Sequence, residues 1–340
     1  MAQGEKRREP VQPANNGAPL LAIRDLTKRF KLPLGLLPWA LRHRADVVTG
    51  VDHVSLEVHN GEILGIVGES GCGKTTLLRC LVRIYEPDSG QVLFEGQDLV
   101  TLKAREMRRV RRKIQMVYQD PYSSLNPRLT VRQMLDEVLA VHHICPPDGR
   151  RGRAVQLLEM VGMGADALAR LPSQFSGGQR QRLGIARALA MEPTVLLADE
   201  PVSALDVSIQ AQVINLLMEL RQELGLTMVF VSHDLRIVRH VSERVAVMYL
   251  GKVMEMGPTH RVFTNALHPY TQVLLAAAPR LDPTVRSEVS AVQGDPPNPI
   301  HIPPGCRFHP RCPAAMEQCR ADIPLLKEIE SGHLAACHLY

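Results

Sequence analysis

The chain has 340 residues, of which 45% are hydrophobic and 22% are charged, and its formal net charge at pH 7 is +5. That length is sufficient for a large core and about two domains. Acidic and basic residues are interspersed, and the densest basic stretch, 105–113, contains no aromatic side chain, so it is typical of a solvated helix face rather than a nucleic-acid site. No apolar run approaches the roughly 20 residues of a transmembrane helix, and the N-terminal residues lack the apolar core of a signal peptide. We therefore expect the chain to remain in the cytosol.

The first segment, 1–19, is polar and contains several glycines and prolines, which predicts a disordered tail. A glycine-rich loop, G-E-S-G-C-G-K-T at 68–75, lies between the apolar run 63–67 and a helix-like stretch. Glycines let successive backbone N–H groups turn toward a phosphate, and the helix start adds a positive dipole end. Lys74 can then reach the outer phosphates, and the Thr75 hydroxyl can bind Mg²⁺. A turn that only joins strand and helix is the alternative, which this context disfavours.

Two carboxylates end a second apolar strand, T-V-L-L-A-D-E at 194–200. The ends of parallel strands are where open α/β sheets build their sites. Asp199 would hold Mg²⁺ through water, and Glu200 would orient or deprotonate the attacking water. Alone, this pair would more simply be a solvated turn, but a phosphate-binding loop in the same chain favours the functional interpretation.

Four further motifs occur in order: V-Y-Q-D at 117–120, F-S-G-G-Q at 175–179, S-A-L-D at 203–206 and V-S-H-D at 231–234. With the phosphate loop, they resemble the nucleotide-binding subunits of ATP-binding cassette (ABC) transporters over nearly the whole chain. The resemblance implies an α/β P-loop ABC ATPase at 20–258, with a RecA-like core sheet, an antiparallel β subdomain and an α-helical signature subdomain at about 121–187. The one departure, Phe175 where leucine is commoner, should affect packing more than phosphate contact.

The same resemblance implies the roles of individual residues. Glu200, His233 and Gln119 would be catalytic, and Thr75, Gln119 and Asp199 would bind Mg²⁺. ATP would be bound by Phe30, Gly68, Glu69, Ser70, Gly71, Cys72, Gly73, Lys74, Thr75, Thr76, Ser176, Gly177, Gly178, Gln179 and Asp206. The loop at 176–179 offers a second anion-binding helix start, and the resemblance places it against the γ-phosphate held by a partner subunit, in a head-to-tail dimer.

Three of these features also have simpler interpretations. His233 alone could be a satisfied core histidine, and Phe30, the expected adenine platform, could be a core aromatic. The segment 31–47, which contains the only tryptophan, Trp39, is longer than the minimal fold needs, and we interpret it as a flap near the nucleotide or the permease.

The last segment, 259–340, is rich in proline and contains four of the seven cysteines: Cys306, Cys312, Cys319 and Cys337. Cytosolic proteins rarely keep disulfides, so metal ligation competes with inert thiols, while the tight C-x₂₋₄-C pair of structural zinc sites is missing. The arrangement is similar to the C-terminal extension of peptide-importer ATPases, which implies a 4Fe-4S cluster. Zinc and plain cysteines remain alternatives.

The runs 119–128 and 268–272 resemble the oligopeptide, dipeptide and nickel importers, with features of the "F" ATPase subunit. This resemblance implies ATP-driven peptide import by a heterodimer with a second ATPase, beneath two permeases and an extracytoplasmic solute-binding protein, at the cytoplasmic face of the cell membrane and without nucleic acid. Alternatives are an importer of nickel or another small solute, a soluble ABC ATPase of DNA repair or translation, and a regulatory iron–sulfur protein.

Overall fold

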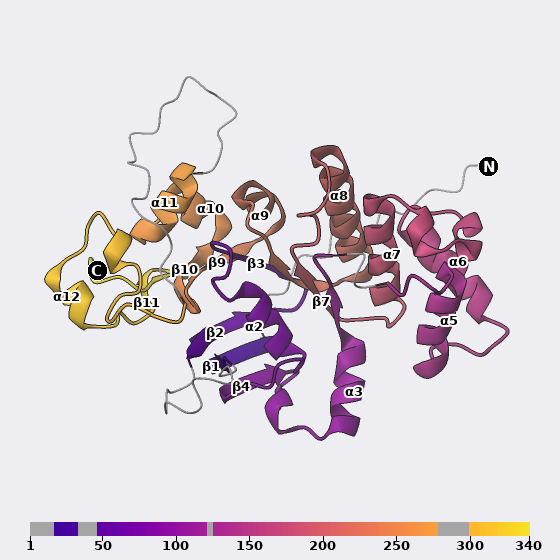
Figure 1. The fold of residues 1–340 in the computed structure, drawn as a ribbon, viewed down its shortest axis with the longest axis horizontal. Helices are drawn as coiled ribbons and strands as arrows, with labels where there is room; N and C mark the ends of the chain where they lie inside the picture. Colours follow the sequence, from indigo (N-terminus) through magenta and orange to yellow (C-terminus); the bar gives the residue numbers. More distant parts are fainter. Residues whose placement is uncertain (1–16, 33–45, 121–124, 278–298) are drawn as a thin grey trace, which may run out of the picture.

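The computed structural model describes residues 17–32, 46–120, 125–277 and 299–340 (Figure 1). The predicted tail up to residue 16 and most of the predicted flap, including Trp39, lie outside the described residues. Four residues that follow the V-Y-Q-D motif, 121–124, also lie outside them. Within the described ranges, no helix is both long enough and apolar enough to cross a membrane.

A central sheet of eight strands has the order β11-β12-β10-β9-β3-β8-β7-β6. Its parallel part consists of β6 (Ile114–Val117), β7 (Val195–Asp199), β8 (Thr227–Val231), β3 (Ile63–Val67) and β9 (Arg244–Tyr249). Strands β3, β7 and β8 are buried throughout, because both faces of the sheet are covered, which explains why they are apolar apart from Thr227 at the start of β8 and Asp199 at the end of β7. Their carboxyl ends therefore meet at one edge, where open α/β sheets form their sites.

One face of the central sheet is covered by an antiparallel sheet of order β2-β1-β4-β5. Its strands are β1 (Leu21–Lys31), β2 (Val47–Val58), β4 (Ser89–Phe94) and β5 (Gln97–Asp98). Alternate residues of β3 divide between two cores: Leu64 and Ile66 pack with helix α2 (Lys74–Leu81) and this second sheet, whereas Ile63 and Val67 pack on the opposite side. The period-two alternation of a strand thus joins the two layers.

Helices occupy the interval between β6 and β7, where the described residues include no strand. They are α5 (Val131–Val141), α6 (Arg150–Met160) and α7 (Gly177–Leu189), with 3₁₀ turns at Ala165–Ala169 and Pro172–Gln174. Other helices are α3 (Ala104–Lys113), α8 (Val207–Leu224) and α9 (Leu235–Val241), with a 3₁₀ turn at Leu99–Thr101. The predicted fold class, a P-loop α/β core with an antiparallel sheet and a helical part, is confirmed.

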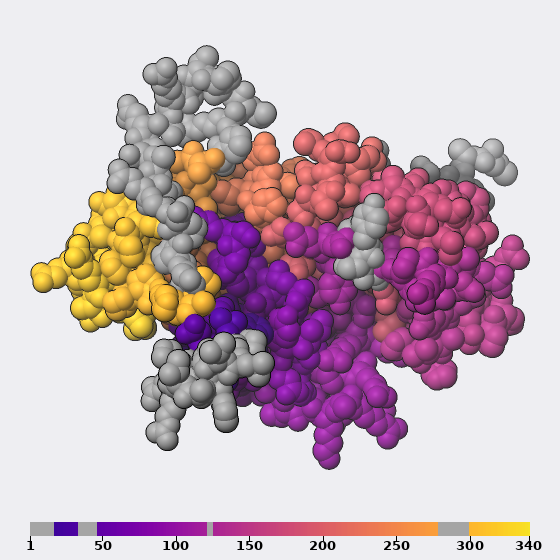
Figure 2. Space-filling view, in the orientation of Figure 1, coloured from indigo at the N-terminus to yellow at the C-terminus, as the bar shows by residue number. Residues whose placement is uncertain are grey.

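The C-terminal segment is joined to the central sheet rather than set apart from it. After β10 (Lys252–Pro258) come α10 (Thr259–Thr264), α11 (Pro269–Ala277), a 3₁₀ turn at His309–Arg311, α12 (Glu317–Ala321), β11 (Lys327–Glu330) and β12 (His333–Ala335). Strand β12 pairs with β10 and thus covers the free backbone edge of that strand. In Figure 2 this yellow segment forms one end of the molecule, opposite the magenta helices.

Candidate functional site

The phosphate-loop motif lies between β3 and α2, at the carboxyl edge of the central sheet. Gly73 has φ 108°, and a Cβ there would lie 2.0 Å from the carbonyl oxygen of Gly50. No side chain fits this space, so the glycine is required by both conformation and contact. The strand–loop–helix arrangement leaves the loop's backbone N–H groups at a helix start, which suits a phosphate.

Lys74, the first residue of α2, is 5% exposed. Its Nζ donates to the carbonyl oxygens of Gly68 at 2.8 Å and Glu69 at 3.1 Å, so the loop curls around the ammonium group. The same Nζ lies 3.9 Å from Glu200 Oε1. A buried cation held by loop carbonyls, with one carboxylate near it, is suited to exchange those weak partners for phosphate oxygens.

Thr75 and Asp199 form the second contact across the site, because the Thr75 hydroxyl donates to Asp199 Oδ1 at 2.9 Å. Asp199 ends β7 and is 2% exposed. Burial raises the pKa of this carboxyl, and the Thr75 hydrogen bond together with the charges of Arg79 and Lys74 partly opposes that rise. Hydroxyl and carboxylate oxygens are ligands that Mg²⁺ accepts, so the pair fits the predicted ion.

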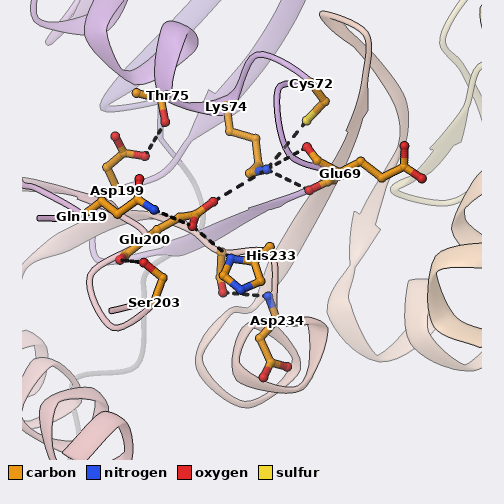
Figure 3. A network of polar contacts seen from close by, with 12 residues as sticks. Glu69, Cys72, Lys74, Thr75, Gln119, Asp199, Glu200, Ser203, His233 and Asp234 are labelled. Atoms are coloured by element: carbon orange, nitrogen blue, oxygen red, sulfur yellow. Dashed lines mark hydrogen bonds and ion pairs between the residues drawn. The ribbon is translucent and has the colours of Figure 1, made fainter. Parts of the chain in front are cut away.

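The three predicted catalytic side chains meet at one carboxylate (Figure 3). Gln119 Nε2 donates to Glu200 Oε2 at 3.3 Å, and His233 Nδ1, which must carry the proton, donates to the same oxygen at 2.9 Å. These residues follow β6, β7 and β8, which are neighbours in the sheet. Glu200 itself has φ 46°, and its amide donates to the carbonyl of Val231 at 3.0 Å. Such a strained backbone, held by a hydrogen bond, is typical of functional positions.

Phe30 lies at the end of β1, close to the start of α2. A Cβ on Gly50 would lie 2.8 Å from Thr76 and 3.1 Å from the Phe30 ring, so Gly50 separates them by little space. The ring is half-buried and packs edge-on against Tyr85 at 5.1 Å between centroids. The position is compatible with an adenine platform next to the phosphate loop, and the role stays a prediction.

The signature loop begins α7, with Ser176 as N-cap. Ser176 Oγ accepts from the Gln179 amide at 3.4 Å, and Gln179 Oε1 accepts from the Ser176 amide at 3.1 Å, which forms a capping box. Figure 1 shows α7 among α5, α6 and α8, well apart from α2. The two anion-binding helix starts therefore do not meet within one chain. Asp206, the N-cap residue of α8, is exposed.

The four C-terminal cysteines lie near one another without forming a ligand group. Burial raises the pKa of Cys306 to about 11, and the charges of Cys319, Cys337 and Cys312 add to that rise. Cys306 and Cys319 lie in one buried cluster, Cys312 packs against it, and the Cys306 amide donates to the Cys319 carbonyl at 2.8 Å. However, within the described ranges no set of three or more His, Cys, Asp or Glu side chains is placed to hold a metal ion. The predicted 4Fe-4S cluster stays a prediction.

Sequence reasoning gave no role to two residues of the C-terminal segment that contact the phosphate loop. Arg311 donates to both carboxylate oxygens of Glu69, at 2.9 and 3.0 Å, and the Tyr270 hydroxyl accepts from the Glu69 amide at 3.0 Å. Tyr270 lies in the run 268–272, which served only as a family marker. Arg311 lies between two cysteines of a proline-rich segment, and its partner Glu69 is 242 positions away. No local sequence pattern therefore indicates this contact.

These features together define an ATP-binding cassette ATPase, and comparisons with known proteins agree. Residues 51–203 match the ABC transporter family, and residues 254–319 match the oligopeptide/dipeptide transporter C-terminal region. A solved dimeric ATP-binding cassette in a post-hydrolysis state, bound to ADP and Pi, has a TM-score of 0.60 and 31% identity, covering 70% of this chain and 98% of that one. The protein CbiO1 of Clostridium perfringens, part of the ABC transporter complex CbiONQ, has a TM-score of 0.61 and 28% identity, covering 73% and 91%.

Relatives of known sequence extend the similarity to the C-terminal segment. A probable peptide ABC transporter ATP-binding protein of Sinorhizobium fredii is 50% identical over 94% of this chain and 90% of its own length. The oligopeptide transport ATP-binding protein AppF of Bacillus subtilis is 49% identical over 96% and 99%. The chain belongs to the family of ATP-binding subunits of oligopeptide/dipeptide ABC transporters.

Proposed function

We propose that this chain hydrolyses ATP to power the import of dipeptides or oligopeptides through a membrane ABC transporter. The convergence of Gln119, His233 and Lys74 on Glu200, beside the Thr75–Asp199 pair, carries the ATPase part of the proposal. Similarity over 94% and 96% of this chain to ATP-binding proteins of peptide transport supports the substrate class. A nickel or other small-solute importer is the alternative, because the site geometry concerns ATP and not the solute.

The phosphate loop and Lys74 would hold the β- and γ-phosphates of ATP. Thr75 and Asp199 would hold Mg²⁺, Asp199 through water, and the ion supplies neutralisation of charge on the transferred phosphoryl group. Phe30 would support the adenine ring. Because Asp199 is buried, its carboxylate has little freedom to move, and it would therefore fix the position of the ion relative to Lys74.

Glu200 would accept the proton of the attacking water, since its carboxylate lies at the centre of the polar network. His233 would hold Glu200 in place and contact the γ-phosphate. Gln119 would couple the presence of nucleotide at the site to the position of the helical part. Because Gln119 and His233 both donate to Oε2, the other oxygen, Oε1, is left on the side of Lys74, 3.9 Å from its Nζ, where it would face the phosphates.

The site would be completed by a second ATPase subunit. Ser176, Gly178 and Gln179 lie away from the chain's own phosphate loop, which supports the proposal that their hydroxyl and N–H groups contact a nucleotide held by a partner. We propose a head-to-tail heterodimer in which the capping box opens to contact that nucleotide, with Asp206 at the contact. ATP-driven closure of the two subunits would move the permeases, and hydrolysis would reopen them.

A groove of about 390 Å³ suits a cytoplasmic segment of a permease. It lies between β6, α5 and α7, and its lining combines apolar residues such as Ile84, Val138 and Met191 with basic residues such as Arg108. Gln181 Nε2 donates to the Tyr118 carbonyl at 3.3 Å inside it, directly before Gln119. Occupancy of the groove is thus connected to Glu200 through one residue. Binding of such a permease segment would hold the subunit at the cytoplasmic face of the membrane.

The four C-terminal cysteines would hold a 4Fe-4S cluster. Four free cysteines in one segment, three buried and one half-buried, are a donor set that such clusters use, although zinc uses it too. Anaerobically purified protein should be brown, with absorption near 400 nm and about four irons per chain. Colourless protein that contains zinc, or protein without metal, would refute the cluster.

The ATPase proposal is tested by Glu200→Gln in the presence of the partner subunit. We expect turnover to fall by about 10²–10⁴-fold, because the base is lost, while ATP binding is preserved by the intact phosphate loop. Near-normal hydrolysis by this variant would refute the role of Glu200. Stimulation of the wild-type ATPase by membranes containing the permeases would separate transport from a DNA-repair or translation role.

A further inference from the structure

A bidentate ion pair joins the C-terminal segment to the phosphate loop. Arg311 Nη1 and Nη2 lie 2.9 and 3.0 Å from the two carboxylate oxygens of Glu69, the second residue of the loop. The Arg311 side chain is 7% exposed and that of Glu69 is 23% exposed. A bidentate pair of this kind fixes both the position and the orientation of the carboxylate, and burial shields it from screening by salt.

An aromatic cluster holds the guanidinium group in place. Tyr249 from β9, Tyr270 from α11 and Phe308 have ring centroids 4.6 to 5.5 Å apart, and all three are almost fully buried. The Arg311 guanidinium lies 5.9 Å from the Tyr249 ring and 6.0 Å from that of Phe308. Arg311 therefore reaches Glu69 from a rigid, apolar support rather than as a free surface side chain.

The backbone of Glu69 is held from the same side. The Tyr270 hydroxyl accepts from the Glu69 amide at 3.0 Å, while the Glu69 carbonyl accepts from Lys74 Nζ at 3.1 Å. One residue thus connects the C-terminal segment to the lysine of the phosphate loop. Figure 3 shows the Glu69 carboxylate pointing away from Lys74 and Glu200.

The direction of that carboxylate matters for a polyanionic ligand. If it were unpaired and free to rotate, a negative charge beside the phosphate loop would repel a triphosphate. Arg311 both neutralises Glu69 and turns it outward. A simple tether between the segment and the ATPase domain would also stabilise the fold, but it would not influence the charge next to the ligand.

We infer that Arg311 and Tyr270 are positioning residues for the phosphate loop, so that the affinity of this chain for ATP depends on its C-terminal segment. The inference rests on the proposed ATP site. The C-terminal segment lies at the opposite end of the sheet from the helical part. The inference nevertheless assigns to this segment an effect on nucleotide binding.

The test compares ATP binding by the full-length chain and by variants, using a fluorescent ATP analogue, with thermal unfolding measured in the absence of nucleotide. Arg311→Gln should weaken binding by about tenfold, which lies within the usual range of coupling between contacting residues. Glu69→Gln added to Arg311→Gln should restore most of the affinity, because the unpaired charge is removed. Tyr270→Phe keeps the ring, removes only the acceptor of the Glu69 amide, and should weaken binding by about threefold.

Arg261→Gln is the matched control. Arg261, in α10, donates to the Ser331 carbonyl at 2.8 Å, so its contact lies within the C-terminal segment and does not reach the phosphate loop. Its affinity for ATP should equal that of the wild type. The inference is wrong, and the proposed function still stands, if folded Arg311→Gln binds ATP as tightly as the wild type. The same holds if adding Glu69→Gln does not restore the affinity for ATP that Arg311→Gln loses. Wild-type chain that fails to bind ATP overturns the proposed function with it.

Discussion

Glu255, in β10, connects three parts of the C-terminal half. It is fully buried and accepts from the amides of Leu267 and His268, at 2.8 and 2.9 Å, and from His333 Nε2 at 2.8 Å. Glu255→Ala leaves three buried donors without an acceptor. Each costs about 1–3 kcal/mol, and allowing for relaxation we expect the variant to lose about 4 kcal/mol of unfolding free energy. With an unfolding entropy of about 2 cal/mol/K per residue, the midpoint should fall by about 6 °C.

The assay is thermal unfolding followed by circular dichroism, with three variants side by side. Glu255→Gln should lie between Glu255→Ala and the wild type, because its amide oxygen can still accept one of the backbone N–H groups. Glu330→Ala, which removes an exposed carboxylate from β11, the strand beyond β12 in the same sheet, should change stability by less than about 0.5 kcal/mol. If Glu255→Ala unfolds at the same temperature as Glu330→Ala, the hydrogen bonds of Glu255 do not hold the segment, and the reasoning is wrong.

Two further predictions concern pH and the groove. Burial lowers the pKa of His268 to about 4 from an ordinary value of 6.5, and a hydrogen bond to the Ala336 backbone opposes this shift only in part. Between these two pH values the unfolded chain therefore binds a proton at His268 that the folded chain does not bind. Stability should therefore fall by up to about 3 kcal/mol as the pH drops from 7 to 4, and His268→Gln should flatten that slope in denaturant titrations at each pH. Ile84→Asp, at the exposed rim of the groove, should abolish stimulation of the ATPase by permease-containing membranes while basal hydrolysis persists; equal stimulation would exclude this groove as the docking site.

The fold and the nucleotide site were predictable because their signals are local. A strand, a loop and a helix start within about 15 consecutive residues encode the phosphate loop. Gln119, Glu200 and His233 each follow an apolar strand, and parallel strands bring such ends to one sheet edge. The sequence therefore indicated that these residues follow strands of one sheet, but their hydrogen bonds to Glu200 were not predicted.

The attachment of the C-terminal segment was not predictable by the same means. β11 has the sequence K-E-I-E and β12 only three residues, so neither carries a clear alternation. Their place in the sheet is decided by the free edge of β10 and by the Glu255–His333 hydrogen bond, which joins residues 78 positions apart. The pairing of Arg311 with Glu69 is equally remote in sequence. Contacts of this kind follow from the folded arrangement and leave no short-range pattern.

The stretch from Cys306 to Cys312 connects the proposed cluster to the proposed ATP site. Arg307, next to Cys306, is mostly buried and pairs with Asp52 of β2, and Arg311, next to Cys312, pairs with Glu69. Two cysteines bound to one cluster would fix both ends of this seven-residue stretch, and therefore both arginines, since neither can shift without moving its neighbouring ligand. Loss of the cluster would free that stretch at the point where it touches the phosphate loop. The cysteines would then be needed for tight ATP binding, although none of the four lies in the phosphate loop.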